Sequence, residues 1–97
     1  MAIEIRFFGL LRNIIGRKVI EISIPSKSLN LKLKDILVDV FTKYPKLKEE
    51  ILNEAQDGFK SQYRLLLNSK EITFKNPLEI IIKENDILQF FPPISGG

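Results

Sequence analysis

The sequence predicts one α+β domain, in which a single main helix packs on one face of a mixed β-sheet. Near both ends of the chain, apolar residues alternate with polar ones, which is the period of a half-buried strand. In the middle, apolar residues recur at the three- and four-residue spacing of an amphipathic helix. The 97 residues are enough to bury one core, and a composition of 44% apolar and 28% charged residues is typical of a globular domain.

Two strands are predicted at the start of the chain. Residues 2–8 alternate, so that Phe7 lies on the apolar face and Phe8 on the opposite, polar face. Residues 19–24 repeat the pattern after a short link that contains Gly16. Because the two segments are so close in sequence, we expect them to pair as an antiparallel hairpin.

The main helix is predicted between Asn30, a residue type that caps helix N-termini, and Pro45, which ends the helix. Its apolar stripe consists of Leu33, Ile36, Leu37, Val40, Phe41 and Tyr44. A second, short helix is predicted over residues 46–55, and residues 56–61 are predicted to form a loop.

The remaining segments predict short strands separated by turns. A strand is expected over residues 63–67, a turn over residues 68–70 and another turn over residues 84–86. The last strand is predicted over residues 87–91. Residues 78–82 fit either a short strand or a buried connection, and the pattern does not decide between them.

The composition excludes several classes of function. The chain has no cysteine and no histidine, so thiolate nucleophiles, disulfides, thiolate metal sites and histidine general bases are all absent. The net charge of +3 is too small to indicate nucleic-acid binding. No apolar stretch is long enough to span a bilayer, and the first residues do not form a secretory signal. We therefore expect a cytoplasmic protein that binds neither nucleic acid nor membrane and holds no metal.

The last six residues form the candidate functional segment, and they are Pro92, Pro93, Ile94, Ser95, Gly96 and Gly97. A Pro-Pro step cannot continue a strand ladder, so the sequence predicts a domain over residues 1–91 and a flexible, extended tail over residues 92–97. When fully extended, six residues reach about 20 Å. The two terminal glycines carry no side-chain bulk, so the tail can enter a narrow channel of another protein and present the carboxylate of Gly97 there.

The chain resembles the MoaD/ThiS family of ubiquitin-like sulfur carriers, and within that family it is most similar to the small subunits of molybdopterin synthase. Three segments carry the resemblance: residues 3–8 with the following Arg12 and Gly16, residues 43–45 at the end of the main helix, and residues 90–97. The last of these segments, with the sequence FFPPISGG, is the most specific.

The chain departs from the family pattern at three places, one of which is the connection before the last strand, lengthened by residues 80–83. In the turn before the last strand, Asn85 stands in front of Asp86, where the family usually has glycine. Asparagine tolerates the positive φ that such a turn needs, so we expect the turn to be kept. The passage from helix to strand over residues 46–62 is also longer than is typical of the family.

The resemblance implies a ubiquitin-like β-grasp fold and a carrier that is not an enzyme on its own. It implies that an E1-like adenylating enzyme uses ATP to join the Gly97 carboxylate to AMP. A sulfur donor protein then replaces AMP, which leaves a terminal thiocarboxylate. No cofactor is bound, because the AMP adduct and 1-thioglycine are covalent states of the C-terminus. In molybdopterin synthase, a heterotetramer with a large subunit, the sulfur is delivered to the pyranopterin precursor of the molybdenum cofactor.

The resemblance also leads to a docking prediction. If the first and last strands are parallel neighbours, as in the ubiquitin fold, Phe8 and Phe91 form an adjacent, outward-facing aromatic pair at the root of the tail. Two exposed aromatic rings beside a reactive arm favour a partner-binding anchor. Arg12 is a further candidate for partner binding, through acidic groups of the partner.

Three other functions are compatible with the same residues. The thiocarboxylate could supply sulfur for tRNA thiolation, or Gly97 could be joined to lysines of target proteins as in ubiquitin-like conjugation. The chain could also be a plain ubiquitin-fold binding module, which would keep its activity when Gly96 and Gly97 are deleted. The Phe-Phe-Pro-Pro segment before the last four residues favours molybdopterin synthesis.

Overall fold

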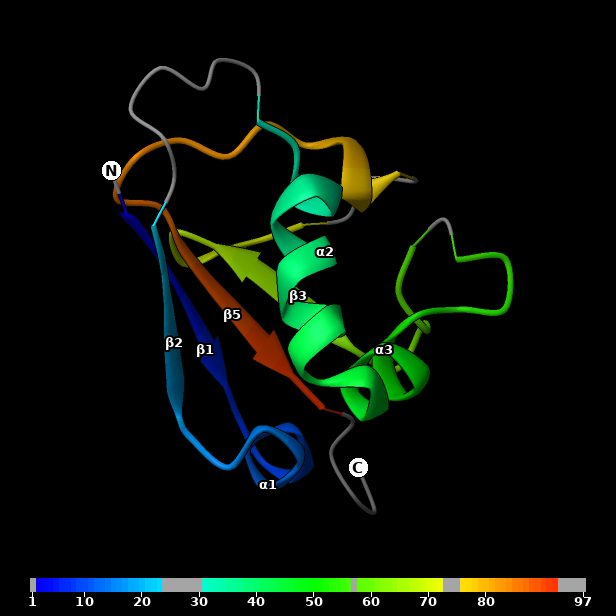
Figure 1. The fold of residues 1–97 in the computed structure, drawn as a ribbon. Coiled ribbons are helices and arrows are strands. Elements are labelled where there is room, and N and C mark those ends of the chain that lie inside the picture. The colour runs from blue at the N-terminus through cyan, green and yellow to red at the C-terminus, as the bar shows by residue number, and fades with distance from the viewer. Residues whose placement is uncertain (1, 24–30, 57, 73–75, 93–97) are drawn as a thin grey trace.

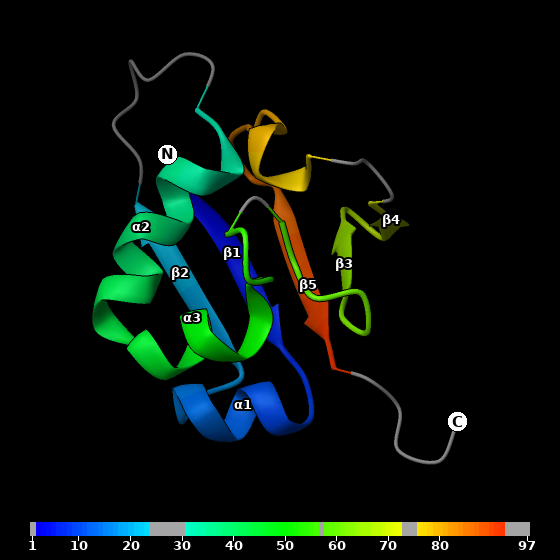
Figure 2. The same ribbon diagram turned by 90° about the vertical axis from the view of Figure 1, so that its right-hand side faces the viewer.

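The computed structural model describes residues 2–23, 31–56, 58–72 and 76–92. They form a five-stranded mixed sheet in the order β2-β1-β5-β3-β4, and α2 and α3 lie on the same face of it (Figures 1 and 2). The strands are β1 (Ala2–Phe7), β2 (Val19–Ser23), β3 (Arg64–Leu67), β4 (Lys70–Glu71) and β5 (Ile87–Phe91). The helices are α1 (Leu10–Ile15), α2 (Leu33–Lys43), α3 (Pro45–Ile51) and the 3₁₀ helix η1 (Pro77–Glu79). The expected α+β class, with one main helix on a mixed sheet, is confirmed.

The last strand of the chain lies in the middle of the sheet. β5 runs parallel to β1, with Phe90 opposite Phe7, and antiparallel to β3, with Phe90 opposite Leu65. β2 pairs antiparallel with β1, which confirms the predicted hairpin, and β4 pairs with β3. The strand from which the tail leaves is therefore hydrogen-bonded on both sides.

The core forms where α2 packs on the sheet. Four residues of the predicted helical stripe are at most 3% exposed, and they are Leu33, Ile36, Leu37 and Val40. The facing residues of β1 and β5 are at most 2% exposed, and they are Ile3, Ile5, Phe7, Leu88 and Phe90. The other two residues of the stripe, Phe41 and Tyr44, are partly buried against the same cluster. The predicted faces of the helix and of both strands are thus confirmed.

The link predicted between the first two strands contains a helix, α1. Only two of its residues, Leu11 and Ile15, are buried, and they lie four positions apart. The helix ends at Gly16, which has a left-handed φ of 79° and whose N–H donates to the carbonyl oxygen of Arg12 at 2.9 Å. Because six residues show barely one helical repeat, the sequence pattern did not reveal this helix.

The helix boundaries differ in detail from the prediction. Asn30, the predicted N-cap, lies outside the described residues, and the residue directly before α2 is Lys32. Its N–H donates to the Asp35 carboxylate at 3.0 Å, so a side chain in the first turn satisfies this donor. Pro45 ends the main helix as predicted, and it also starts α3, which stops at Ile51 and is shorter than residues 46–55.

The predicted turns are confirmed. Asn68 and Ser69 both have positive φ, 51° and 71°, in the two-residue turn between β3 and β4. Asn85 has a φ of 67°, as expected from an asparagine in place of glycine. Residues 78–82 form no strand; η1 is followed by a single β-bridge from Ile81 to Lys32, and the segment is a connection with Ile82 buried.

Tyr63 gives the domain a specific dependence on alkaline pH. Its ring is buried, and its hydroxyl donates to the Glu50 carboxylate of α3. Burial raises the pKa of the Tyr63 hydroxyl above its ordinary value of 10.0, and the hydrogen bond to Glu50 raises it further. Since the folded chain holds this proton more tightly, the resulting stabilisation is complete below pH 10.0 and is lost as the pH rises through the folded-state pKa.

We therefore expect Tyr63→Phe to lower the free energy of unfolding by about 1 kcal/mol at neutral pH, because the bond to Glu50 is lost. The same variant should lose less stability than the wild type above pH 10. Urea unfolding curves at neutral pH and at several alkaline pH values measure both effects. If the free energies of unfolding of the wild type and the variant fall by the same amount above pH 10, Tyr63 is not the source of this pH dependence.

Candidate functional site

The candidate site is the place where the tail leaves the folded domain. β5 ends at Phe91, and Pro92 is the last residue that the structure describes. The other residues of the predicted tail lie outside the described part of the chain, and they are Pro93, Ile94, Ser95, Gly96 and Gly97. We define the tail root as the four residues Phe8, Gly9, Phe91 and Pro92.

Two aromatic pairs lie back to back at the end of β1 and β5. Phe8 stacks on Phe91 with ring centroids 4.4 Å apart and planes inclined by 5°. Phe7 stacks on Phe90 at 5.7 Å and 7° on the face that carries the helices. This follows from strand geometry: neighbouring residues point to opposite faces, and the parallel register places equivalent rings side by side. The predicted adjacency of Phe8 and Phe91 is confirmed. The predicted exposure is not, because the two stacked rings cover one another and each is half-buried.

One side of the outward aromatic pair is bordered by an arginine. Arg64 lies opposite Phe91 in the register of β3 and β5, and its side chain is 71% exposed. Its Nε lies 3.6 Å from the Oε1 of Glu71 on β4, which is a weak and solvent-screened ion pair. The guanidinium therefore keeps most of its capacity to meet an acidic group of a partner.

The other side of the pair opens into a shallow hollow on β1 and β2. It is lined by Phe8 together with Arg6, Lys18, Glu4 and Val19. Arg6 forms an ion pair with Glu4. The hollow contributes Arg6, Lys18 and Glu4, and Arg64 lies on the other side of the aromatic pair. The outward face around the tail root therefore carries a net positive charge. Such a surface is complementary to an apolar pocket of a partner protein that is bordered by acidic side chains.

Arg12 lies next to the tail root but on a different element. It is exposed on α1, and its backbone N–H donates to the carbonyl oxygen of Gly9 at 3.1 Å. The structure therefore places Arg12 one helical turn from the point at which Pro92 passes Gly9. Its role in partner binding stays a prediction.

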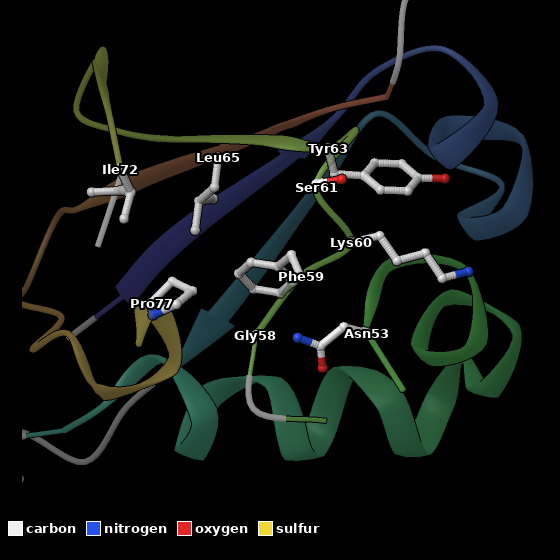
Figure 3. A pocket seen from close by; sticks show the side chains of 9 residues that line it. All are labelled: Asn53, Gly58, Phe59, Lys60, Ser61, Tyr63, Leu65, Ile72 and Pro77. Carbon is white, nitrogen blue, oxygen red and sulfur yellow. The ribbon is translucent and has the colours of Figure 1, made fainter. Parts of the chain in front are cut away.

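A second hollow lies on the other side of the sheet, under the passage from α3 to β3 (Figure 3). It is lined by Asn53, Gly58, Phe59, Lys60, Ser61, Tyr63, Leu65, Ile72 and Pro77. Phe59 from this passage packs edge-to-face on Phe90, with centroids 5.3 Å apart. Lys60 Nζ donates to the Glu49 carbonyl oxygen at 3.0 Å. No carboxylate is among the described residues that line this hollow, so it offers no acid–base pair and serves to hold Phe90.

The described residues provide little for independent chemistry. Within residues 2–23, 31–56, 58–72 and 76–92, no three acidic side chains gather in a way that could hold a metal ion. No helix in the same ranges is long and apolar enough to cross a membrane.

Comparison with known proteins places the chain among small ubiquitin-like proteins. The model of the ThiS family matches residues 5–97. Small archaeal modifier protein 3 from Haloferax volcanii is 24% identical over 97 residues, and the match covers 100% of both chains. The crystal structure of SAMP1 from Haloferax volcanii superposes with a TM-score of 0.80 at 20% identity over 100% of both chains.

A candidate molybdopterin converting factor, subunit 1, from Pyrococcus furiosus superposes with a TM-score of 0.71 at 19% identity, over 97% of this chain and 99% of that one. These likenesses establish the ubiquitin-like β-grasp fold that the resemblance implied. Because the family model extends from β1 through the C-terminal glycine, it includes both the tail root and the tail. The chain belongs to the ThiS family of ubiquitin-like sulfur carriers.

Proposed function

We propose that this sulfur carrier works through the carboxylate of Gly97. An E1-like adenylating enzyme joins a carboxylate oxygen to the α-phosphorus of ATP and releases pyrophosphate, which turns a poor leaving group into a good one. A sulfur donor protein then supplies the sulfur that attacks the carbonyl carbon, AMP leaves, and a thiocarboxylate remains. The chain holds no resident cofactor in this scheme, and the partner enzymes provide the acids, bases and phosphate-binding groups that a chain without Cys and His lacks.

The observation that carries the proposal is the geometry of the tail root. β5 is paired on both sides, so Pro92 starts from a fixed point on the sheet. Directly beside this point, the stacked rings of Phe8 and Phe91 form a half-buried apolar platform with cations around it. A partner that grips the platform has the start of the tail in a defined position, and such pre-positioning is what a reaction at the far end of the tail requires.

We further propose that the sulfur recipient is the pyranopterin precursor, with this chain as the small subunit of a heterotetrameric molybdopterin synthase. The Phe90-Phe91-Pro92-Pro93 segment and the likeness to the Pyrococcus furiosus converting-factor protein support this choice of recipient. The large subunit of such a synthase would bind the precursor and receive the tail.

A second candidate is conjugation to proteins. The similarity to two Haloferax volcanii modifier proteins favours it, because their names describe proteins that modify others. The chemistry begins with the same adenylated Gly97, but a lysine amine of a target attacks the carbonyl carbon in place of sulfur. An isopeptide bond then forms and AMP leaves.

Intact-mass spectrometry of the protein from its own cells, without a C-terminal tag, tests these proposals. The expected result is a fraction that is heavier by the difference between sulfur and oxygen, localised to Gly97. Recovery only as branched conjugates on lysines would favour the second candidate. If only the plain carboxylate is found, even after incubation with ATP, sulfide and the cognate adenylating enzyme, the mechanism at Gly97 is wrong.

The aromatic platform gives a prediction for partner binding. Replacing Phe8 and Phe91 together by Ala is expected to raise the Kd for the large subunit by about 10- to 100-fold, since buried aromatic anchors dominate interfaces. Calorimetric titration measures the change. Val38→Ala is the matched control, because Val38 is an exposed apolar residue (61%) on α2, on the opposite face of the sheet.

The folded state of the double variant must be measured at the same time. The stacked pair is worth about 0.5–1.5 kcal/mol to the fold, so a small fall in the melting temperature is expected. Replacing both rings by Leu keeps most of the apolar area and should recover part of the affinity. If the loss of affinity is no larger than the loss of folded protein accounts for, the platform is not a docking site.

A further inference from the structure

In the tail root, the ring of Pro92 lies close against the backbone of Gly9. Gly9, in the turn between β1 and α1, has φ 57° and ψ −132°, a conformation that residues with a side chain avoid. A Cβ at this position would lie 2.7 Å from the Cγ of Pro92 and 3.6 Å from its Cδ. The first distance is far below a carbon–carbon contact, so no residue larger than glycine fits while Pro92 keeps its place.

Pro92 cannot move aside easily. Its ring is fused to the backbone, so beyond the small shift that a change of ring pucker allows, displacing the Cγ displaces the chain. On the residues just before it, the Phe8 N–H donates to the Phe90 carbonyl oxygen at 3.2 Å, and the ring of Phe91 stacks on that of Phe8. These contacts fix the chain up to Phe91. The approach of the Pro92 ring to Gly9 extends these contacts to the first residue of the tail.

We infer that Gly9 is a positioning residue of the C-terminal tail: by leaving room for the Pro92 ring against the turn, it sets the direction in which the chain leaves the sheet. The consequence for sulfur transfer rests on the proposed function at Gly97, whereas the geometric part does not. A partner that holds the aromatic platform would find the start of the tail at a set angle to it.

A second glycine of the chain separates this role from simple backbone strain. Gly16 also has positive φ, 79°, but a Cβ there would meet no atom within 4 Å. Alanine at either position is strained by the backbone conformation, and only alanine at position 9 meets the tail. Gly16→Ala is therefore a control for positive φ alone. Because the φ and ψ of Gly9 (57° and −132°) strain alanine more than the left-handed conformation of Gly16 (79° and 8°), the Pro92→Ala background controls for that excess strain. We expect both variants to lower the melting temperature.

The contact itself is isolated by a double-mutant cycle. Pro92→Ala removes the Cγ and Cδ atoms of the ring and leaves the Cβ. That Cβ would lie 4.0 Å from a Cβ at position 9, which is an ordinary contact. If the inference holds, Gly9→Ala changes the direction of the tail when Pro92 is present and has no further effect once Pro92 is alanine. An effect of strain alone would be the same in both backgrounds.

Tail direction can be measured without any enzyme. The chain has no cysteine, so Ser95→Cys provides a unique site for a nitroxide spin label. The label broadens the amide signals of the residues that it approaches. We expect the pattern of broadened amides to change in Gly9→Ala, to stay as in the parent in Gly16→Ala, and to be the same in Pro92→Ala with and without Gly9→Ala. An unchanged pattern in Gly9→Ala would overturn the inference.

If the Gly9→Ala variant does not fold, the Pro92→Ala variant alone still tests the inference. Removing the ring that fixes φ at position 92 and lies against Gly9 is expected to spread the broadening over more amides, and a pattern identical to that of the parent would overturn the inference.

A kinetic measurement on chains that keep Ser95 then tests the functional consequence. Gly9→Ala should lower kcat/KM for thiocarboxylate formation by about tenfold or more, while Gly16→Ala leaves it near the wild-type value. Equal values for the two variants would show that tail direction does not matter to the partner. If the wild type itself is not converted, the proposed function fails, but the spin-label result stands.

Discussion

A chain that lacks Gly97 is expected to form a thiocarboxylate at least about 100-fold more slowly than the intact chain. Each extended residue spans up to about 3.5 Å, so deletion retracts the carboxylate by a distance of that order from the position in which the adenylating enzyme holds it. A misplacement of about 1 Å already costs about 10²-fold in rate. The folded domain should be unaffected, because the last strand ends at Phe91 and the last described residue of the buried core is Phe90.

The matched variant adds one glycine after Gly97, which keeps the composition of the tail and shifts the carboxylate by the same distance in the other direction. Both chains should have the melting temperature of the wild type, and both should form the thiocarboxylate slowly. Single-turnover formation of the AMP adduct, followed by mass, separates the activation step from the sulfur step. If the shortened chain reacts within about tenfold of the wild type, the terminal residue is not held at a defined position and the proposed mechanism loses its basis.

The tail is predicted from a signal that is local in the sequence. The Pro-Pro step and the two glycines lie within six residues of one another, so no tertiary contact is needed to bring them together. The aromatic pair of Phe8 and Phe91 is a harder case, since the two residues are 83 positions apart by their numbers (91 minus 8). It was predictable because strand alternation fixes the face of each ring and a parallel pairing fixes their register.

Other features of the site depend on contacts that no local pattern contains. In the sequence, Gly9 merely follows the alternating residues 2–8, and its contact with Pro92 arises only when β5 pairs beside β1 and α1 turns the chain. Likewise, the packing of Phe59 against Phe90 depends on the path of the long passage from α3 to β3. Such contacts are set by the assembled fold, so periodicity and turn residues do not reveal them.

Phe90→Ala is expected to lower the free energy of unfolding by about 3–5 kcal/mol, the largest effect on stability of any substitution considered for this chain. Phe90 is 1% exposed, stacks on Phe7 at 5.7 Å and receives the edge of Phe59 at 5.3 Å. The substitution leaves a cavity bordered by both rings. Because a small domain has only about 5–15 kcal/mol in total, much of the chain should be unfolded at elevated temperature.

Phe91→Ala is the control on the same strand, one residue further along. Its ring lies on the outward face and is half-buried, so only about 1 kcal/mol of stability should be lost with the stack on Phe8. Denaturant unfolding of the two variants compares the faces directly, and similar losses would contradict the assignment of inward and outward rings.

The expected difference between these neighbours has a consequence for every functional test of the tail root. Phe90 of β5 packs in the core, and Phe91 lies on the outward face, where we propose that a partner docks. A loss of sulfur transfer in Phe90→Ala would be explained by unfolding, whereas the same loss in Phe91→Ala would not. Substitutions on the outward face therefore report on docking with little disturbance of the fold that presents the tail.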